Sequence, residues 1–184
     1  MVQIIVWGEI KMALNKIVSD NSKISSNKII FFDTGPIISL VTSRLIWILP
    51  HLKKSFGGKF YITPAVQKEL IERPINVRRF EFEALQVLKL IKEGIIEVYN
   101  KVPQQRAAQL ESLANSSFKI DDKTIDVVQS GELESVACAL ELGAAAVVMD
   151  ERTLRLFIEN SSEMVHLLEG RFNKKVISDT TKIK

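Results

Sequence analysis

Apolar and polar positions along the chain alternate between strand-like runs and helical spacing. Apolar runs at 29–32 and 145–149 predict strands buried on both faces, and 59–62 and 95–98 predict two shorter strands. Between them, apolar residues recur at helical spacing over 77–92, 103–114 and 130–142. This alternation predicts an α/β protein, a three-layer α/β/α arrangement around a central, mostly parallel sheet.

Proline, glycine and polar clusters predict where the elements end. The segment 34–36 opens a helix that we expect to run to about Leu49, before Pro50. Thr63 and Pro64 start a helix expected to end at Arg73. Glycines at 94 and 143 end the helices before them, Ser130 caps the helix that follows it, and the polar stretch 115–123 predicts a loop.

The two ends of the chain differ from its centre. We predict an N-terminal extension over residues 1–27 and a single domain over 28–184. Within the extension, 2–7 suits an edge strand and 10–18 an amphipathic helix; the other interpretation is a disordered leader upstream of a start at Met12. A short helix is expected over 153–159, and 174–178 predicts a last edge strand.

Composition fits one globular domain with a sizeable core. The 184 residues are 46% hydrophobic and 26% charged, and the net charge of +3 is too mild to indicate a nucleic-acid partner by itself. The one cysteine, Cys138, excludes an internal disulfide and is compatible with the reducing cytoplasm, where we expect the protein. No apolar run reaches the roughly 18 residues of a membrane span, so no membrane partner is expected.

Two of the apolar runs end on a single aspartate. Asp33 follows 29–32 and Asp150 follows 145–149, and the carboxyl ends of parallel strands line the crevice where ligands bind. Glu69 and Glu134 lie on predicted helices, each at the border of an apolar stripe. We therefore predict a pocket of four carboxylates, which a divalent cation would stabilise against mutual repulsion.

Each acid also has a plainer interpretation. Asp33 and Asp150 suit turn or cap positions, and Glu69 suits a solvated helix face. Glu132 and Glu134 suit the first turn of a helix, where the macrodipole favours anions. The metal-site hypothesis therefore depends on the four acids converging.

The segments that carry these acids resemble four motifs of the PIN-domain nucleases of archaea and bacteria, including the VapC-type toxins. The resembling segments are 30–38, 61–70, 131–140 and 146–152, in the family's order. The resemblance assigns the metal-binding and catalytic acids to Asp33, Glu69, Glu134 and Asp150, with Thr34 as the accompanying hydroxyl and Glu132 as an auxiliary acid. The chain departs from the pattern at Val148, where many relatives have threonine.

The resemblance implies a metal-dependent endoribonuclease. One or two Mg²⁺ or Mn²⁺ ions would activate a water for attack on an RNA phosphodiester. It also implies, for many relatives, a small antitoxin protein and a homodimer. Arg44, Lys53, Lys54, Arg152 and Arg155 are candidates for holding the RNA backbone, although each also suits ordinary solvated surface.

Other classes compete with this interpretation. The main rival is a non-catalytic PIN-like module that binds RNA or a protein. A haloacid-dehalogenase-type phosphatase needs a second acid two residues after Asp33, where the chain has Gly35. His51, His166 and Cys138 are isolated, which disfavours a zinc site or a catalytic triad, and no glycine-rich phosphate loop is present.

Overall fold

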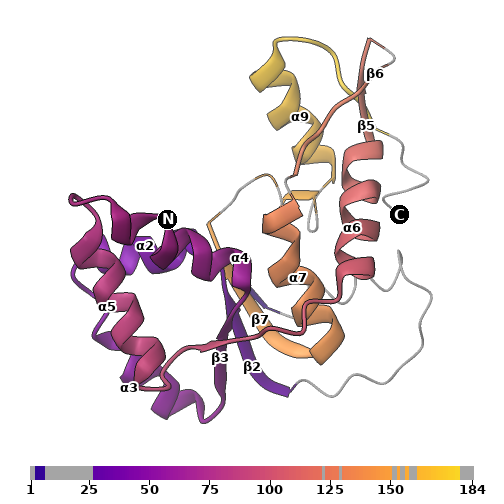
Figure 1. The fold of residues 1–184 in the computed structure, drawn as a ribbon. Coiled ribbons are helices and arrows are strands. Elements are labelled where there is room, and N and C mark those ends of the chain that lie inside the picture. Colours follow the sequence, from indigo (N-terminus) through magenta and orange to yellow (C-terminus); the bar gives the residue numbers. More distant parts are fainter. Residues whose placement is uncertain are drawn as a thin grey trace.

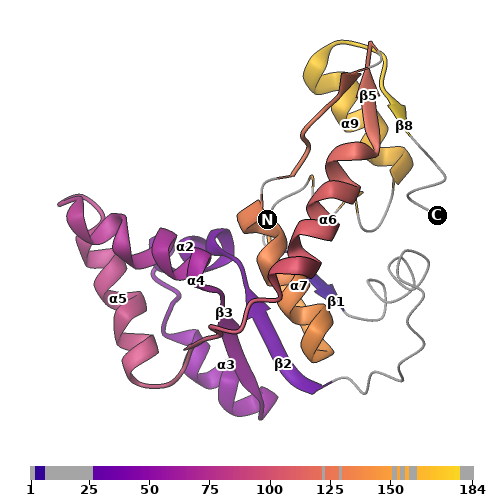
Figure 2. The ribbon, with the colours of Figure 1, turned by 45° about the vertical axis from the view of Figure 1, so that its right-hand side comes forward.

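A mostly parallel sheet forms the centre of the protein. The computed structural model describes residues 3–6, 27–121, 123–128, 130–150, 153, 156–157 and 161–178. Among these residues, the main sheet has five strands in the order β1-β7-β2-β3-β4 (Figure 1). They are β1 (Gln3–Val6), β2 (Asn27–Phe32), β3 (Lys59–Ile62), β4 (Glu97–Val98) and β7 (Ala144–Met149). Their pairing is parallel from β7 to β4, and only β1 runs antiparallel, paired with β7 at the edge of the sheet. Figure 2 shows β1 on the side of β2 away from β3.

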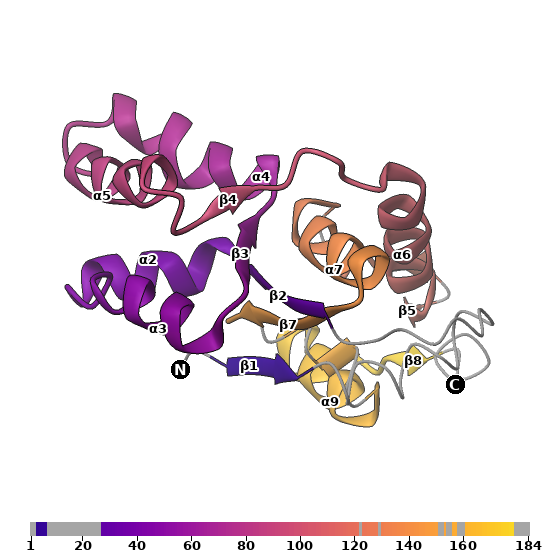
Figure 3. The same cartoon turned by 90° about the horizontal axis from the view of Figure 1, so that it is seen from below.

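Helices cover both faces of this sheet (Figure 3). One face carries α2 (Thr34–Thr42), α3 (Ile48–Phe56), α4 (Pro64–Gln67), the π-helical turn η1 (Lys68–Glu72), the short 3₁₀ turn η2 (Pro74–Asn76) and α5 (Glu81–Lys92). The other face carries α6 (Gln104–Ser116), α7 (Ser130–Leu142) and α9 (Ser161–Phe172). The three-layer α/β/α fold predicted from the sequence is confirmed.

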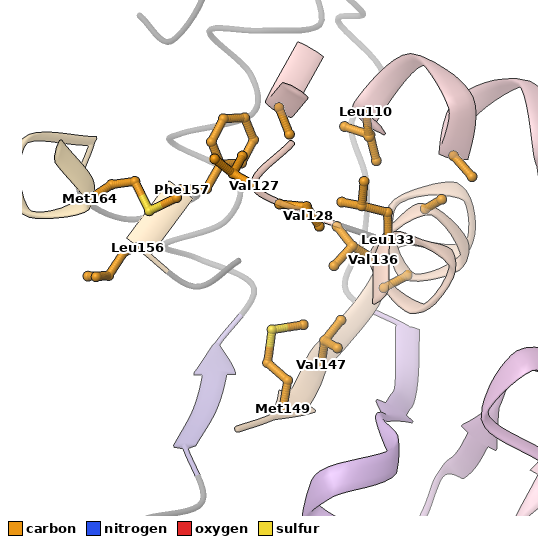
Figure 4. Close-up of a cluster of buried hydrophobic side chains, with 14 of the residues drawn as sticks. Leu110, Val127, Val128, Leu133, Val136, Val147, Met149, Leu156, Phe157 and Met164 are labelled. Carbon is orange, nitrogen blue, oxygen red and sulfur yellow. The ribbon is translucent and has the colours of Figure 1, made fainter. Parts of the chain in front are cut away.

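Side-chain alternation on the central strands builds two cores. On β2, Phe31 enters the core under α6 and α7, and Phe32 enters the core under α2 and α5. On β7, Val147 and Met149 face the first core and Val148 the second. Figure 4 shows part of the first core, where Val147 lies beside the α7 side chains. Both central strands are therefore buried on both faces, as their continuous apolar runs predicted.

The single helix predicted from 34 to about 49 is wrong. The chain forms α2 and α3 instead, with Arg44 in the left-handed region (φ +58°) between them. Pro50 lies in the first turn of α3 rather than after a helix. A proline in that turn removes an N–H that has no intrahelical partner, so proline marks a helix start as readily as an end.

Other boundaries differ less. Thr63 accepts a hydrogen bond from the Val66 amide and caps α4, and η1 ends before Pro74, as expected. The helix expected from 77 begins at Glu81, after the 3₁₀ turn. Gly143 ends α7 in the left-handed conformation, at φ +57°.

A second, smaller sheet lies beyond α6. It has the order β6-β5-β8, with β5 (Phe118–Ile120), β6 (Lys123–Thr124) and β8 (Ile177–Ser178). The loop predicted over 115–123 is therefore wrong in its middle, where buried Phe118 and Ile120 flank exposed Lys119 in a strand pattern. The strand expected near 174–178 exists as β8, but it pairs with β5 and not with the edge of the main sheet.

The N-terminal strand predicted over 2–7 is found as β1, and it occupies the edge of the main sheet beside β7. The helix predicted over 10–18 and most of the one over 153–159 lie outside the described residues. The division of the chain at residue 27 stays a prediction.

Candidate active site at the carboxyl ends of the strands

The strands β2 and β7 place Asp33 and Asp150 at the same edge of the sheet. Phe32 is in register with Val148, and the Asp33 amide donates to the Val148 carbonyl at 2.9 Å. Asp150 follows Met149, the last residue of β7. Since both backbones belong to the buried centre of the sheet, the positions of the two aspartates are fixed by the fold.

The turn after β2 also brings the Asp150 carboxylate close to Asp33. A Cβ built on Gly35 would lie 1.9 Å from Asp150 Oδ1 and 2.3 Å from Oδ2, which no real side chain tolerates. The carboxylate therefore rests directly on the Gly35 backbone, two residues after Asp33. Only glycine at position 35 leaves room for this approach.

Glu69 reaches the same turn from η1. The Thr34 hydroxyl donates a hydrogen bond of 2.7 Å to Glu69 Oε2. Glu69 belongs to the π-helical turn that continues α4, where an extra residue per turn changes the direction of the side chains. The segment 33–35 thus carries Asp33 and is contacted by two further predicted acids, Glu69 at Thr34 and Asp150 at Gly35. The Glu69 and Asp150 side chains are exposed there, and Asp33 is half-buried.

Glu134 comes from a different direction. It lies in α7, which packs against β2 and against α4. Glu134 Oε2 is buried and has no hydrogen-bond partner. One turn further along α7, burial and then the Glu134 charge raise the pKa of the Cys138 thiol to about 12. Glu134 therefore carries a carboxylate oxygen that lacks the donor or cation a buried carboxylate needs.

The oxygens of these side chains suit a hard divalent cation, but they do not form a closed ligand set. Within the part of the chain that the structure describes, no three His, Cys, Asp or Glu side chains are grouped so that they could hold a metal ion. The donor chemistry fits Mg²⁺ or Mn²⁺, because all four groups are carboxylates. The orphaned Glu134 oxygen fits as well. Convergence of all four acids stays a prediction.

Of the remaining residues that the sequence suggested, some are described by the structure and others are not. Lys53 donates to the Gly94 carbonyl and pairs with Glu97 of β4, two strands away from β2, which leads to Asp33. Lys54, on the same helix, and Arg44 are exposed. The Glu132 side chain, Arg152 and Arg155 lie outside what the structure describes.

One polar residue beside the candidate site was missed by the sequence reasoning. Glu83 lies in the first turn of α5 and has a buried carboxylate oxygen, Oε2, without a hydrogen-bond partner. It shares with Glu69 the lining of a pocket of about 430 Å³ between α2, η1 and α5. The signal was available: Glu83 is three residues after Phe80 and four before Val87, both on the predicted apolar face of that helix.

Comparison with known families agrees with the architecture. The family model DUF3368, described as a PIN domain, matches residues 29–166, about three quarters of the chain. No curated protein and no solved structure gives a significant match. None of the described helices is long and apolar enough to cross a membrane. PIN domains are generally nucleases that typically use divalent metals, and the matched segment contains Asp33, Glu69, Glu134 and Asp150. With most of its length matched and a parallel α/β/α architecture in agreement, this chain belongs to the PIN-domain family.

Proposed function

We propose that this protein is a metal-dependent endoribonuclease that cleaves RNA phosphodiester bonds with Mg²⁺ or Mn²⁺. The observation that carries the proposal is the turn at 33–35, where the Thr34 hydroxyl binds Glu69 and the Asp150 carboxylate rests on Gly35. Glu69 and Asp150, from separate parts of the chain, thus each contact the segment that directly follows Asp33. A structural turn or cap would not need that arrangement.

The proposed ligands are Asp33, Glu69, Glu134 and Asp150, with Glu132 as an auxiliary. Asp33 and Asp150 would be the fixed members, because their backbones belong to paired central strands. Glu69 and Glu134 project from helices and would complete the set. When bound, the cation supplies a water of lowered pKa and offsets the negative charge that develops on the leaving oxygen.

The side chains around the acids have their own tasks in this proposal. The Thr34 hydroxyl holds the Glu69 carboxylate in one orientation. Gly35 has no side chain, and this leaves space for the Asp150 carboxylate to lie against the turn at 33–35. Carboxylates alone would repel an RNA phosphate, so substrate binding at this edge depends on the cation that neutralises them.

Cleavage of a single-stranded or structured RNA in Mn²⁺ tests the proposal. The wild-type protein is expected to cleave and to leave 5′-phosphate and 3′-hydroxyl ends, and Asp33→Asn is expected to be inactive while melting at the same temperature. Asp121→Asn is the matched control, because Asp121 pairs with Lys174 on the distant second sheet. Equal cleavage by wild type and Asp33→Asn would refute the assignment.

A second candidate function is a non-catalytic module of the same fold that binds RNA or a protein. It is favoured by the absence, among the described residues, of three acids grouped closely enough to hold a metal. RNA binding that needs no metal and is unchanged in Asp33→Asn, without any cleavage, would support the module over the nuclease.

A protein partner is the last part of the proposal: a homodimer, and a small antitoxin if the protein is the toxin of a pair. Large apolar side chains are exposed on the α3 and α5 side of the molecule, with Trp47 60% and Phe82 71% exposed. Leu45, Leu52 and Leu85 are also exposed there. Exposed apolar groups of this size favour a partner surface, and light scattering of the purified protein measures its oligomeric state.

A further inference from the structure

The pocket between α2, η1 and α5 borders the candidate active site at Glu69. Its volume of about 430 Å³ is within the range of small-ligand sites. Its walls are mostly apolar and include Ile38, Leu70 and Val87. Glu69 belongs both to this lining and to the turn that carries Asp33. Because Ile38 is four residues after Thr34, the pocket opens one helical turn along α2 from that turn.

Glu83 adds to this apolar pocket a carboxylate that needs a hydrogen-bond donor. Glu83 is part of the lining, and its Oε2 is unpartnered but closed off from solvent by its neighbours, so a rotation of the side chain is needed to turn that oxygen toward the pocket. An unsatisfied buried carboxylate oxygen is costly, which favours such a rotation when a donor is present. An entirely apolar occupant would leave that cost in place. The occupant that suits the pocket has flat or apolar faces and a donor group at one edge.

We propose that this pocket binds one unstacked nucleobase of the RNA strand held for cleavage, with Glu83 as acceptor for the base's amino group. The inference rests on the proposed nuclease function and adds a base-reading site to it. Bases extruded from single strands are recognised by stacking on aromatic side chains and by hydrogen bonds to their edges. The Phe80 ring, 47% exposed and part of the lining, supplies the stacking face.

Two features favour RNA over a protein side chain as the occupant. The pocket shares Glu69 with the proposed metal site, so a strand with its phosphate at Asp33 has its neighbouring base within reach. The Arg79 guanidinium lies 5.5 Å from the Phe80 ring centroid and also lines the pocket, where it would meet the phosphate that follows the base. Arg78, next to it, is exposed.

A carboxylate acceptor discriminates between bases. Adenine, cytosine and guanine carry exocyclic amino donors, whereas the edge of uracil, like that of thymine, places a carbonyl oxygen at O4. Uracil has no exocyclic amino group, and its one edge donor, the ring N3–H, lies between two carbonyl oxygens that would be set against the Glu83 carboxylate. We therefore expect uracil to be disfavoured at one fixed position beside the cleaved bond.

Cleavage of a randomised single-stranded RNA pool, followed by sequencing of the ends, tests the proposal. Wild type is expected to disfavour uracil about tenfold at that position, the size of one base-edge hydrogen-bond preference. Glu83→Gln, whose amide can both donate and accept, is expected to lose most of this preference while still cleaving. Glu81→Gln is the matched control, since Glu81 is exposed on the same helix and does not line the pocket.

Equilibrium binding provides a readout without cleavage. Asp33→Asn is expected to bind a short oligo(A) about tenfold more tightly than oligo(U), and the double variant with Glu83→Gln to bind them equally. An identical base preference in wild type and Glu83→Gln would overturn the proposal. It would also be overturned if Glu83→Gln changed only the self-association of the protein, since the pocket would then belong to a protein partner. If wild type cleaves nothing, the nuclease proposal fails, and the binding comparison alone then supports or refutes the base site.

Discussion

Replacing Gly35 with alanine tests whether the Asp150 carboxylate acts from its place on the 33–35 turn. The added Cβ would lie 1.9 Å from Asp150 Oδ1, whereas ordinary contacts begin at about 3.4 Å. The carboxylate must therefore move by more than an ångström. Gly35 lies in α2 without a positive φ, so alanine causes no backbone strain there. Alanine is even favoured over glycine within a helix, by up to about 1 kcal/mol.

The expected result is a loss of function without a loss of fold. A misplacement of about 1 Å at a reacting centre can cost on the order of 100-fold in rate, which corresponds to about 2.7 kcal/mol of transition-state stabilisation. We expect Gly35→Ala to lower Mn²⁺-dependent cleavage by about that factor. Its melting temperature should stay within a few degrees of wild type, because the carboxylate is exposed and can move into solvent.

The assay pairs single-turnover RNA cleavage with calorimetric unfolding. Gly170→Ala is the matched control: Gly170 also lies in a helix, and a Cβ there would meet nothing within 4 Å. That variant should gain up to about 1 kcal/mol of stability and keep full activity. Wild-type cleavage and Mn²⁺ affinity in Gly35→Ala would refute the argument that Asp150 acts from this position.

Three further outcomes follow from individual contacts. Thr34→Val removes the hydrogen bond to Glu69 and should weaken Mn²⁺ binding about tenfold, since a hydrogen bond to a charged group contributes about 1.5 kcal/mol; Thr34→Ser should restore the affinity measured by titration calorimetry. Glu134→Gln removes the charge from a partly exposed carboxylate whose Oε2 is buried and unpartnered, and it should stabilise the metal-free protein by about 1 kcal/mol in urea unfolding while weakening Mn²⁺ binding. Destabilisation would contradict this. Burial raises the pKa of the Cys138 thiol from 9.0 to about 12. Between these pH values the unfolded chain binds fewer protons than the folded one, so the free energy of unfolding falls as pH rises, by about 1.4 kcal/mol per pH unit for this group. The Cys138→Ala variant should therefore lose less stability per pH unit than wild type above pH 9.

The main sheet was predictable because its central strands are buried on both faces. A continuous apolar run such as 29–32 has few other placements, and the aspartate after it then falls at the carboxyl edge. The gap between α2 and α3 was not predictable in the same way. It depends on Arg44 adopting a left-handed conformation, and Pro50 suits a helix start and a helix end equally well.

Partner choice in the second sheet was also beyond local pattern. The stretch 118–120 alternates buried and exposed residues over only three positions. A strand pattern this short is outweighed by the polar residues around it, which favour a loop. Its pairing with β8 joins segments more than fifty residues apart. Local propensity carries no information on which distant edge a short strand will join.

For the candidate site, position was predictable and side-chain contact was not. The ends of the predicted strands indicated the positions of Asp33 and Asp150. The hydrogen bond from Thr34 to Glu69, however, depends on the π-helical turn η1, which no pattern of residues in the sequence predicted. Glu83 was passed over because a glutamate in a helix first turn normally faces solvent and favours the macrodipole. Its spacing from Phe80 and Val87 placed it on the apolar face of the helix, and the packing of α5 against α2 and η1 then buries its Oε2.

The crystal structure of the wild-type protein soaked in Mn²⁺, read by the anomalous signal of the metal, is the most direct measurement of the central claim. We expect a peak beside the 33–35 turn, coordinated by oxygens of Asp33 and Asp150 and by at least one of Glu69 and Glu134. A manganese peak elsewhere, or an unliganded turn at saturating Mn²⁺, would contradict it.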